Sequence, residues 1–457
     1  MKNDFISILK TIEPKEQEGF KTYIHCFYGT QKVSLSVYED IAAALPSDTA
    51  LATIRKAAVG DKNKLNAFSE LKGWLFEFLA VQEVRNNTVE AKFLGIEALR
   101  KRGLHEVSQQ KAKQLRQELD KEIHLDTEYL YGQVRLSHIN YFSTPHDKFY
   151  DSQADLQQLQ GELDNFYIAT KLKYSVELYS RAHILQDKYE IHLLEEILAH
   201  IQSQKAVHPI VKDVYLPMLD MAKEQSDTAY FKLKTFLMQS KGHNTPEKQA
   251  ILLYLINFTA HQIRKGQKTF TEEYFDLAQF GLATSLFTVT GNFPAETFLN
   301  IVNVACHLKE CEWVKKFVTD CAPALLPTEK EDTERFAWAR IHFEEKRFDA
   351  VTTLLNKMFF KNMLLGVNAR LLLLRSYYEL KEPYNELVIH CNNLYLYAYR
   401  SKTIGENLKT SIINFVKIFR QLVTKKPKKQ LLKELENKQG LLICADWLQL
   451  KIEELKN

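Results

Sequence analysis

Hydrophobic residues recur at spacings of three and four along almost the whole chain, whereas alternating runs of β-branched residues are nearly absent. This spacing puts them on one face of a helix, because an α-helix makes one turn in about 3.6 residues. The strongest example in the N-terminal part of the chain is the stretch 66–83, whose apolar residues are Phe68, Leu71, Leu75, Phe78 and Leu79. The pattern predicts an all-α protein.

A second pattern, in which two rings are separated by five mostly polar residues, repeats along the chain. The ring pairs are His183 and Tyr189, His307 and Trp313, His342 and Phe348, and Tyr378 and Tyr384. Repeats of about 34–40 residues are typical of stacked helix pairs. We therefore expect the eight rings to pack on both sides of the turn within each pair. The three histidines would then occupy equivalent places in successive copies and serve packing rather than catalysis.

Capping residues predict several helix ends. Pro14 and the pair Thr245-Pro246 suit the first turn of a helix. Ser47 offers an oxygen to the helix that follows it, and Gly60 is expected to end that helix in a left-handed conformation. The segment 328–331 has the spacing of a capping box, in which a hydroxyl and a carboxylate satisfy each other's backbone donors.

The break at 143–146 is the best candidate for a boundary between two regions. It divides the chain into an N-terminal helical region, 1–145, and a region of helical repeats, 146–457. We expect a last helix at 441–455 to cap the open end of the repeat array.

The segments 338–355 and 374–390 resemble the tetratricopeptide family of helix-turn-helix repeats. His342, Phe348, Tyr378 and Tyr384 stand where that family has rings, whereas Arg375 stands where it has a small residue. The resemblance implies an irregular tetratricopeptide-like (TPR-like) α-solenoid, built of stacked antiparallel helix pairs.

A second resemblance covers the segments 68–83 and 163–174, which are similar to parts of uncharacterised helical-repeat proteins common in Bacteroidota. It implies a bacterial, cytoplasmic protein and no particular activity. The six scattered cysteines suit a reducing cytosol. The first residues lack the pattern of a signal peptide, and no apolar run is long enough for a membrane helix, so we expect no membrane partner.

Two groups of residues invite a metal-site interpretation. His192, Glu196 and His200 lie on one helix face, but the two histidines are about 12 Å apart along the axis. Cys306, His307, Cys311 and Cys321 are rich in soft ligands but lack the paired C-x2-C spacing of structural zinc sites. The interpretation we favour is a solvated helix face in the first case and core cysteines in the second. No nucleophile motif or phosphate loop is present, so we predict neither catalysis nor a cofactor.

These observations favour a non-enzymatic scaffold that binds a protein or peptide on a concave face. The alternative is a nucleic-acid-associated factor that uses the basic stretches 100–116 and 425–429. The net charge of +4 is small for 457 residues and by itself predicts no affinity for nucleic acid. The candidate contacts with an anionic partner are Lys425, Lys426, Lys428 and Lys429.

Overall fold

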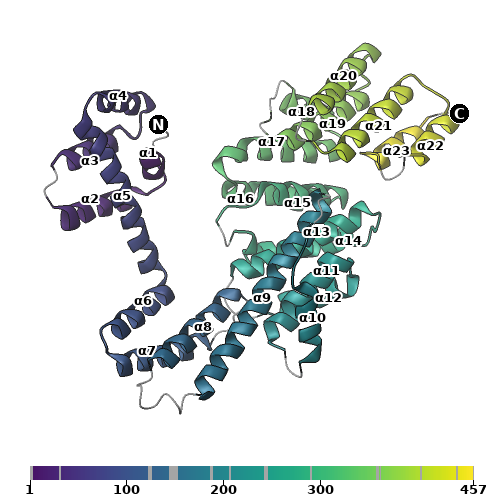
Figure 1. Ribbon diagram of the computed structural model, residues 1–457. Coiled ribbons are helices and arrows are strands. Elements are labelled where there is room, and N and C mark those ends of the chain that lie inside the picture. The colour runs from purple at the N-terminus through teal and green to yellow at the C-terminus, as the bar shows by residue number, and fades with distance from the viewer. Residues whose placement is uncertain are drawn as a thin grey trace. The chain divides into compact units, whose positions relative to one another are not determined.

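The computed structural model describes most of the chain, and every regular element in the described part is helical (Figure 1). The described residues are 4–29, 32–121, 126–143, 153–185, 189–204, 207–240, 245–288, 291–356, 360, 362–401, 404–438 and 441–455. The exception to helix is one isolated β-bridge between Phe293 and Leu325. The predicted all-α class is confirmed.

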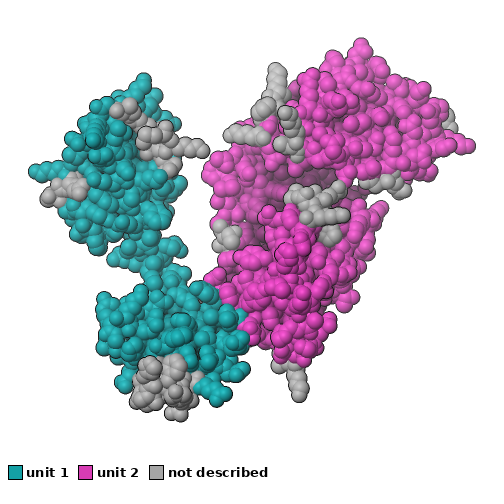
Figure 2. Space-filling model, in the orientation of Figure 1, with its two compact units in different colours: residues 1–122, 131–163 teal, residues 123–130, 164–457 magenta. Residues whose placement is uncertain are grey.

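The chain divides into two compact units (Figure 2). Unit 1 contains residues 1–122 and 131–163, and unit 2 contains residues 123–130 and 164–457. The boundary that we predicted at 145 lies outside the described residues.

Unit 1 has two small hydrophobic cores. Its helices, together with α8, which lies partly in unit 2, are α1 (Asp4–Leu9), α2 (Pro14–Tyr28), α3 (Lys32–Ala44), α4 (Asp48–Val59), α5 (Lys62–Asn86), α6 (Thr88–Lys101), α7 (His105–Leu119) and α8 (Thr127–Phe142). The first core joins α1 to α5 and includes the predicted Leu71, Leu75 and Phe78. The second core joins α6, α7 and α8 through residues such as Phe93 and Leu115.

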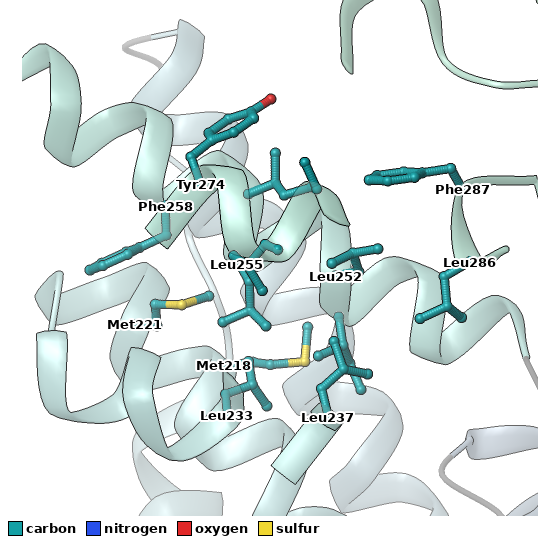
Figure 3. Packing of buried hydrophobic residues seen from close by; sticks show 14 of the residues in the cluster. Met218, Met221, Leu233, Leu237, Leu252, Leu255, Phe258, Tyr274, Leu286 and Phe287 are labelled. Atoms are coloured by element: carbon teal, nitrogen blue, oxygen red, sulfur yellow. The ribbon is translucent and has the colours of Figure 1, made fainter. Parts of the chain in front are cut away.

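Most of unit 2 consists of consecutive helices that pack against their neighbours. They are α9 (Gln153–Leu185), whose residues 153–163 belong to unit 1, α10 (Leu194–Ser203), a π-helical turn η2 (Val211–Tyr215), α11 (Leu216–Glu224), α12 (Asp227–Gln239), α13 (Pro246–Arg264), α14 (Phe270–Ala283), α15 (Ala295–His307), α16 (Cys311–Cys321), α17 (Pro327–Glu344), α18 (Phe348–Leu355), α19 (Met363–Glu379), α20 (Tyr384–Arg400), α21 (Glu406–Val423), α22 (Lys428–Glu436) and α23 (Ala445–Glu453). Side chains from α11, α12, α13 and α14 meet in one core around Leu255 (Figure 3). A second core extends from α17 to α23.

Five successive helix pairs, from α13–α14 to α21–α22, share the same connecting turn. Each turn has one residue with positive φ, and these residues are Gly266, Lys309, Lys346, Lys381 and Lys425. In every case the next amide donates to the carbonyl five residues earlier, at 2.8–3.1 Å, as Arg347 does to His342. This is the Schellman end of a helix, in which glycine is the usual left-handed residue. The chain therefore contains a structural repeat whose last four turns use lysine instead.

The turns correct the register that we inferred from the rings. His307, His342 and Tyr378 lie two, four and three residues before the left-handed lysine of their pair. The prediction that the ring residues occupy equivalent places is therefore wrong. The hydrogen-bonded turn sets the register, while a ring can pack from any of several neighbouring positions near a helix end.

The predicted helix ends met different outcomes. Thr245 accepts from the Lys248 amide at 3.2 Å and Ser47 accepts from the Ala50 amide at 3.3 Å, so both caps are confirmed. The capping box at 328–331 is wrong, because α17 begins at Pro327 and has no side-chain cap. Gly60 ends α4 with a φ of −88°, which is right-handed and not the left-handed conformation that we expected.

Candidate functional site

An open pocket lies between the first half of α19 and the last half of α20. Its volume is about 470 Å³, within the usual range for small-ligand sites. The pocket is lined by Met363, Arg370, Asn393, Leu396, Tyr397, Arg400 and Ser401. The lining residues of α20 are spaced by three and four, so they share one helix face. Those of α19, seven residues apart, also share a face.

Gly366 gives the pocket its shape. A Cβ atom at this position would overlap the hydroxyl of Tyr397 and come within 3.3 Å of Nη1 of Arg370. The absence of a side chain therefore lets the Tyr397 ring lie directly against the backbone of α19. Glycine weakens a helix interior by about 1 kcal/mol relative to alanine, and here it makes room for the ring.

Two guanidinium groups give the pocket its charge. Arg370 stacks on the Tyr397 ring, 3.7 Å from its centroid, and donates to the Gly366 carbonyl at 3.0 Å. Arg400 is exposed at the end of α20. Among the described residues, no carboxylate lies within ion-pair distance of either group. Because a guanidinium stays protonated in proteins, the pocket is suited to bind an anion and not to transfer a proton.

The other end of α19 is filled by the chain's own side chains. The guanidinium of Arg375 lies 4.3 Å from the ring centroid of Phe343 and 5.3 Å from that of Trp447. Trp447, on α23, donates to Glu379 at 3.1 Å, and Lys451 pairs with the same carboxylate at 3.0 Å. Nε of Arg375 has no hydrogen-bond partner among the described residues. Burial lowers the pKa of Arg375 below its ordinary value. We infer that this end supports packing.

Three of the predicted ring residues pack against other rings, and a fourth, His342, is partly buried. Trp313 stacks on Phe317 with centroids 5.5 Å apart, and Phe348 meets Phe343 edge-on at 5.4 Å. Tyr378 makes an edge contact with Trp447 at 5.4 Å. His342 is partly buried, and its Nδ1 lies 3.5 Å from the Glu345 carboxylate.

Three of the remaining ring residues are exposed and not buried at the turn between two helices, where we expected them. Tyr384 is 52% exposed, Tyr189 is 38% exposed, and His307 is also exposed. Tyr384 and His307 are therefore not buried in a core as we expected, and the packing role of Tyr189 stays a prediction. They lie at helix ends or in loops, where a ring can project into solvent. The side chain of His183 lies outside the described residues.

The predicted lysine cluster is not brought together with the pocket. Lys425 is the left-handed residue of a turn. Lys428 donates to the backbone carbonyls of Glu453 and Leu455 at 2.8 and 3.4 Å, where it stabilises the end of α23. Lys426 and Lys429 are exposed. In the stretch 100–116, the guanidinium of Arg116 pairs with Glu162 at 3.0 Å. Lys428 and Arg116 therefore have structural roles within the protein.

Neither metal-site interpretation is supported by a ligand cluster. Within the described residues, no three histidine, cysteine, aspartate or glutamate side chains are grouped as they would be around an ion. Cys306 is fully buried, and burial raises the pKa of its thiol to about 11. Such a thiol is a core residue and a poor ligand at neutral pH.

A buried polar network ties α9, η2 and α13 together. The Tyr215 hydroxyl donates to Glu247 at 2.5 Å, and Lys173 pairs with the other oxygen of that carboxylate at 2.8 Å. Burial raises the pKa of Tyr215 well above its ordinary value, so the phenol stays protonated and keeps donating. The polar groups of this network pair with one another, so we interpret the network as a structural link between the three elements.

We did not predict the pocket residues Gly366, Arg370, Tyr397 and Arg400 from the sequence. A signal was present, since Asn393, Leu396, Tyr397 and Arg400 follow the spacing of one helix face. Comparisons with protein-family models, with curated proteins and with solved structures found no match to this chain. None of the described helices combines the length and the apolar character needed to cross a membrane.

Proposed function

We propose that this protein is a non-enzymatic, TPR-like helical-repeat scaffold that binds a protein or peptide partner in the bacterial cytoplasm. The observation that carries the proposal is the identical turn in five successive helix pairs, α13 to α22. A helix pair cannot bury its apolar stripe alone, so repeated pairs stack and leave extended faces on which a partner can lie.

The distribution of polar groups supports a binding role. The buried Tyr215 network and the ion pairs around Glu379 are satisfied by the protein itself. The pocket between α19 and α20, in contrast, offers two guanidinium groups and a ring to a partner. We place the binding region at this pocket and not on the face around Arg375, because that face is occupied by Trp447.

Affinity capture with the full-length protein from the lysate of its source organism tests this proposal. We expect one partner in stoichiometric amount, retained at about 100 mM salt, where charges are screened over roughly 10 Å. Repeated recovery of no stoichiometric protein would contradict a scaffold function. Salt-sensitive retention on heparin together with nucleic acid in the captured material would support the alternative function instead.

A further inference from the structure

We infer that the α19–α20 pocket binds an acidic peptide segment of the partner. A carboxylate of this segment lies between Arg370 and Arg400, and a neighbouring apolar side chain lies on Met363 and Leu396. The inference rests on the proposed function and specifies the chemistry of the partner that the scaffold recognises.

The charge of the pocket selects the carboxylate. A guanidinium presents two parallel N–H donors that match the two oxygens of a carboxylate. Stacking on Tyr397 and the hydrogen bond to the Gly366 carbonyl hold Arg370 in one orientation. A donor that is already oriented loses less conformational entropy on binding. Because Arg370 and Arg400 have no carboxylate partner among the described residues, an external acid meets no internal competitor.

The apolar part of the pocket favours a peptide over a small free acid. Leu396 is 39% exposed and lines the pocket beside Tyr397. A dicarboxylate or a phosphate ion would leave this apolar surface in water. A peptide with leucine next to glutamate covers it and gains the free energy of burial.

The test is the binding of a short fluorescent peptide of alternating glutamate and leucine to the full-length protein, measured by anisotropy. We expect binding that weakens with added salt, and no binding of the same peptide with glutamine in place of glutamate. Arg370→Gln and Arg400→Gln should each weaken binding by about tenfold or more. The matched control is Arg335→Gln. Arg335 lies on α17, eleven residues before the left-handed Lys346, just as Arg370 lies eleven residues before the left-handed Lys381. Arg335 pairs with Glu331 at 2.6 Å, so this variant should bind like the unmodified protein.

Three outcomes would overturn the inference. They are equal affinity for the glutamine peptide, unchanged binding by both pocket variants, and glutarate or inorganic phosphate binding as tightly as the peptide. Arg370→Lys keeps the charge but loses the fork of donors, so its affinity should lie between those of the unmodified protein and Arg370→Gln. Circular dichroism of each variant separates lost binding from lost folding. Capture of the same partner by the unmodified protein and by both pocket variants would contradict this inference and the placement of the binding region at the pocket, and would leave the proposed scaffold function intact.

Discussion

Helix α19 carries two arginines stacked on aromatic rings, but their surroundings differ. Toward the C-terminal end of the helix, Arg375 lies between Phe343 and Trp447, and α23 covers it. Near the middle of the helix, Arg370 lies on Tyr397 and, together with Arg400, faces an open pocket that reaches Met363 at the N-terminal end. The same residue type on the same helix therefore supports packing toward one end and is available for binding toward the other.

The difference shows that stacking on a ring does not by itself distinguish a structural arginine from a binding one. What distinguishes them is whether other side chains cover the stacked arginine and ring. A tryptophan from a later helix covers Arg375, whereas Arg370 lines an open pocket in which Gly366 makes room for the Tyr397 ring. The comparison can be broken by removing the cover over Arg375, by filling the space at Gly366, by altering the turn that ends α19, and by altering His390 of α20, which stacks on α19.

The largest expected effect follows from Trp447→Ala. Trp447 is 9% exposed and contacts Tyr378, Phe415 and Phe419, so its removal leaves a cavity. We expect the free energy of unfolding to fall by about 3–5 kcal/mol. Urea unfolding measures the loss. The matched control is Tyr399→Ala, whose ring is 63% exposed and whose removal should change stability by at most about 0.5 kcal/mol. Equal effects of the two variants would show that α23 does not seal this end.

A pair of glycine substitutions compares a core with the pocket. In Gly281→Ala the new Cβ would lie 2.5 Å from Phe287 and 2.6 Å from Leu252, two side chains labelled in Figure 3. We expect this overpacking to cost about 1–3 kcal/mol. In Gly366→Ala the Tyr397 ring has open space to move into, and the gain in helix propensity of about 1 kcal/mol offsets the displacement.

Thermal unfolding of the two glycine variants measures this difference. Gly281→Ala should unfold at a lower temperature, and Gly366→Ala should unfold close to the unmodified protein while binding the acidic peptide less tightly. A strongly destabilised Gly366→Ala variant would mean that the pocket wall is as rigid as the core.

A smaller effect is expected from Lys381→Gly, at the turn that ends α19. Lys381 has a φ of 59°, which strains a residue with a side chain and does not strain glycine. After subtracting the greater flexibility of glycine in the unfolded chain, we expect a gain of about 0.5–1 kcal/mol. Lys316→Gly in the interior of α16 is the control and should lose about 1 kcal/mol. Destabilisation by both substitutions would contradict the strain that we assign to the turn.

The pH dependence of His390 should give the smallest effect. His390 stacks on Tyr377 with centroids 4.2 Å apart, and burial lowers the pKa of His390 from its ordinary value of 6.5. The unfolded chain then binds the proton more readily than the folded one, so stability is full above about pH 6.5 and falls as the pH drops below it. Urea unfolding of His390→Gln should show a shallower loss of stability between roughly pH 7 and pH 5 than the unmodified protein shows. An unchanged slope would rule out a contribution from this ring.

The sequence predicted the helices and the position of their turns better than it predicted the register. Rings collect near helix ends, so their spacing located the turns around 346 and 381. The spacing of the rings could not fix the register of these turns, because a Schellman turn is defined by its backbone hydrogen bonds and its left-handed residue. In four of the five turns that residue is a lysine, so no glycine marks the position in the sequence. No pattern in the sequence indicated that the guanidinium of Arg375 lies between Phe343 and Trp447.

The pocket could not be predicted from sequence patterns, because it depends on contacts between residues that are far apart in the chain. Gly366 matters only because Tyr397 lies against it, and these residues are far apart in the chain. The spacing of Leu396, Tyr397 and Arg400 also fits an ordinary exposed helix face. The lysines of 425–429 were conspicuous as a run of charge, although one of them stabilises the end of α23. A charge run is visible in a sequence, whereas an unpaired arginine becomes visible only when its neighbours are known.

Hydrogen–deuterium exchange of the full-length protein, with and without the glutamate–leucine peptide, tests the contrast between the two ends of α19 most directly. If the open end is the binding site, the peptide slows exchange in the segments 363–370 and 393–401. The closed end, at 375–379 and 445–453, should exchange at the same rate in both samples. Slower exchange at the closed end alone, or no change in the pocket segments at a saturating peptide concentration, would contradict the account.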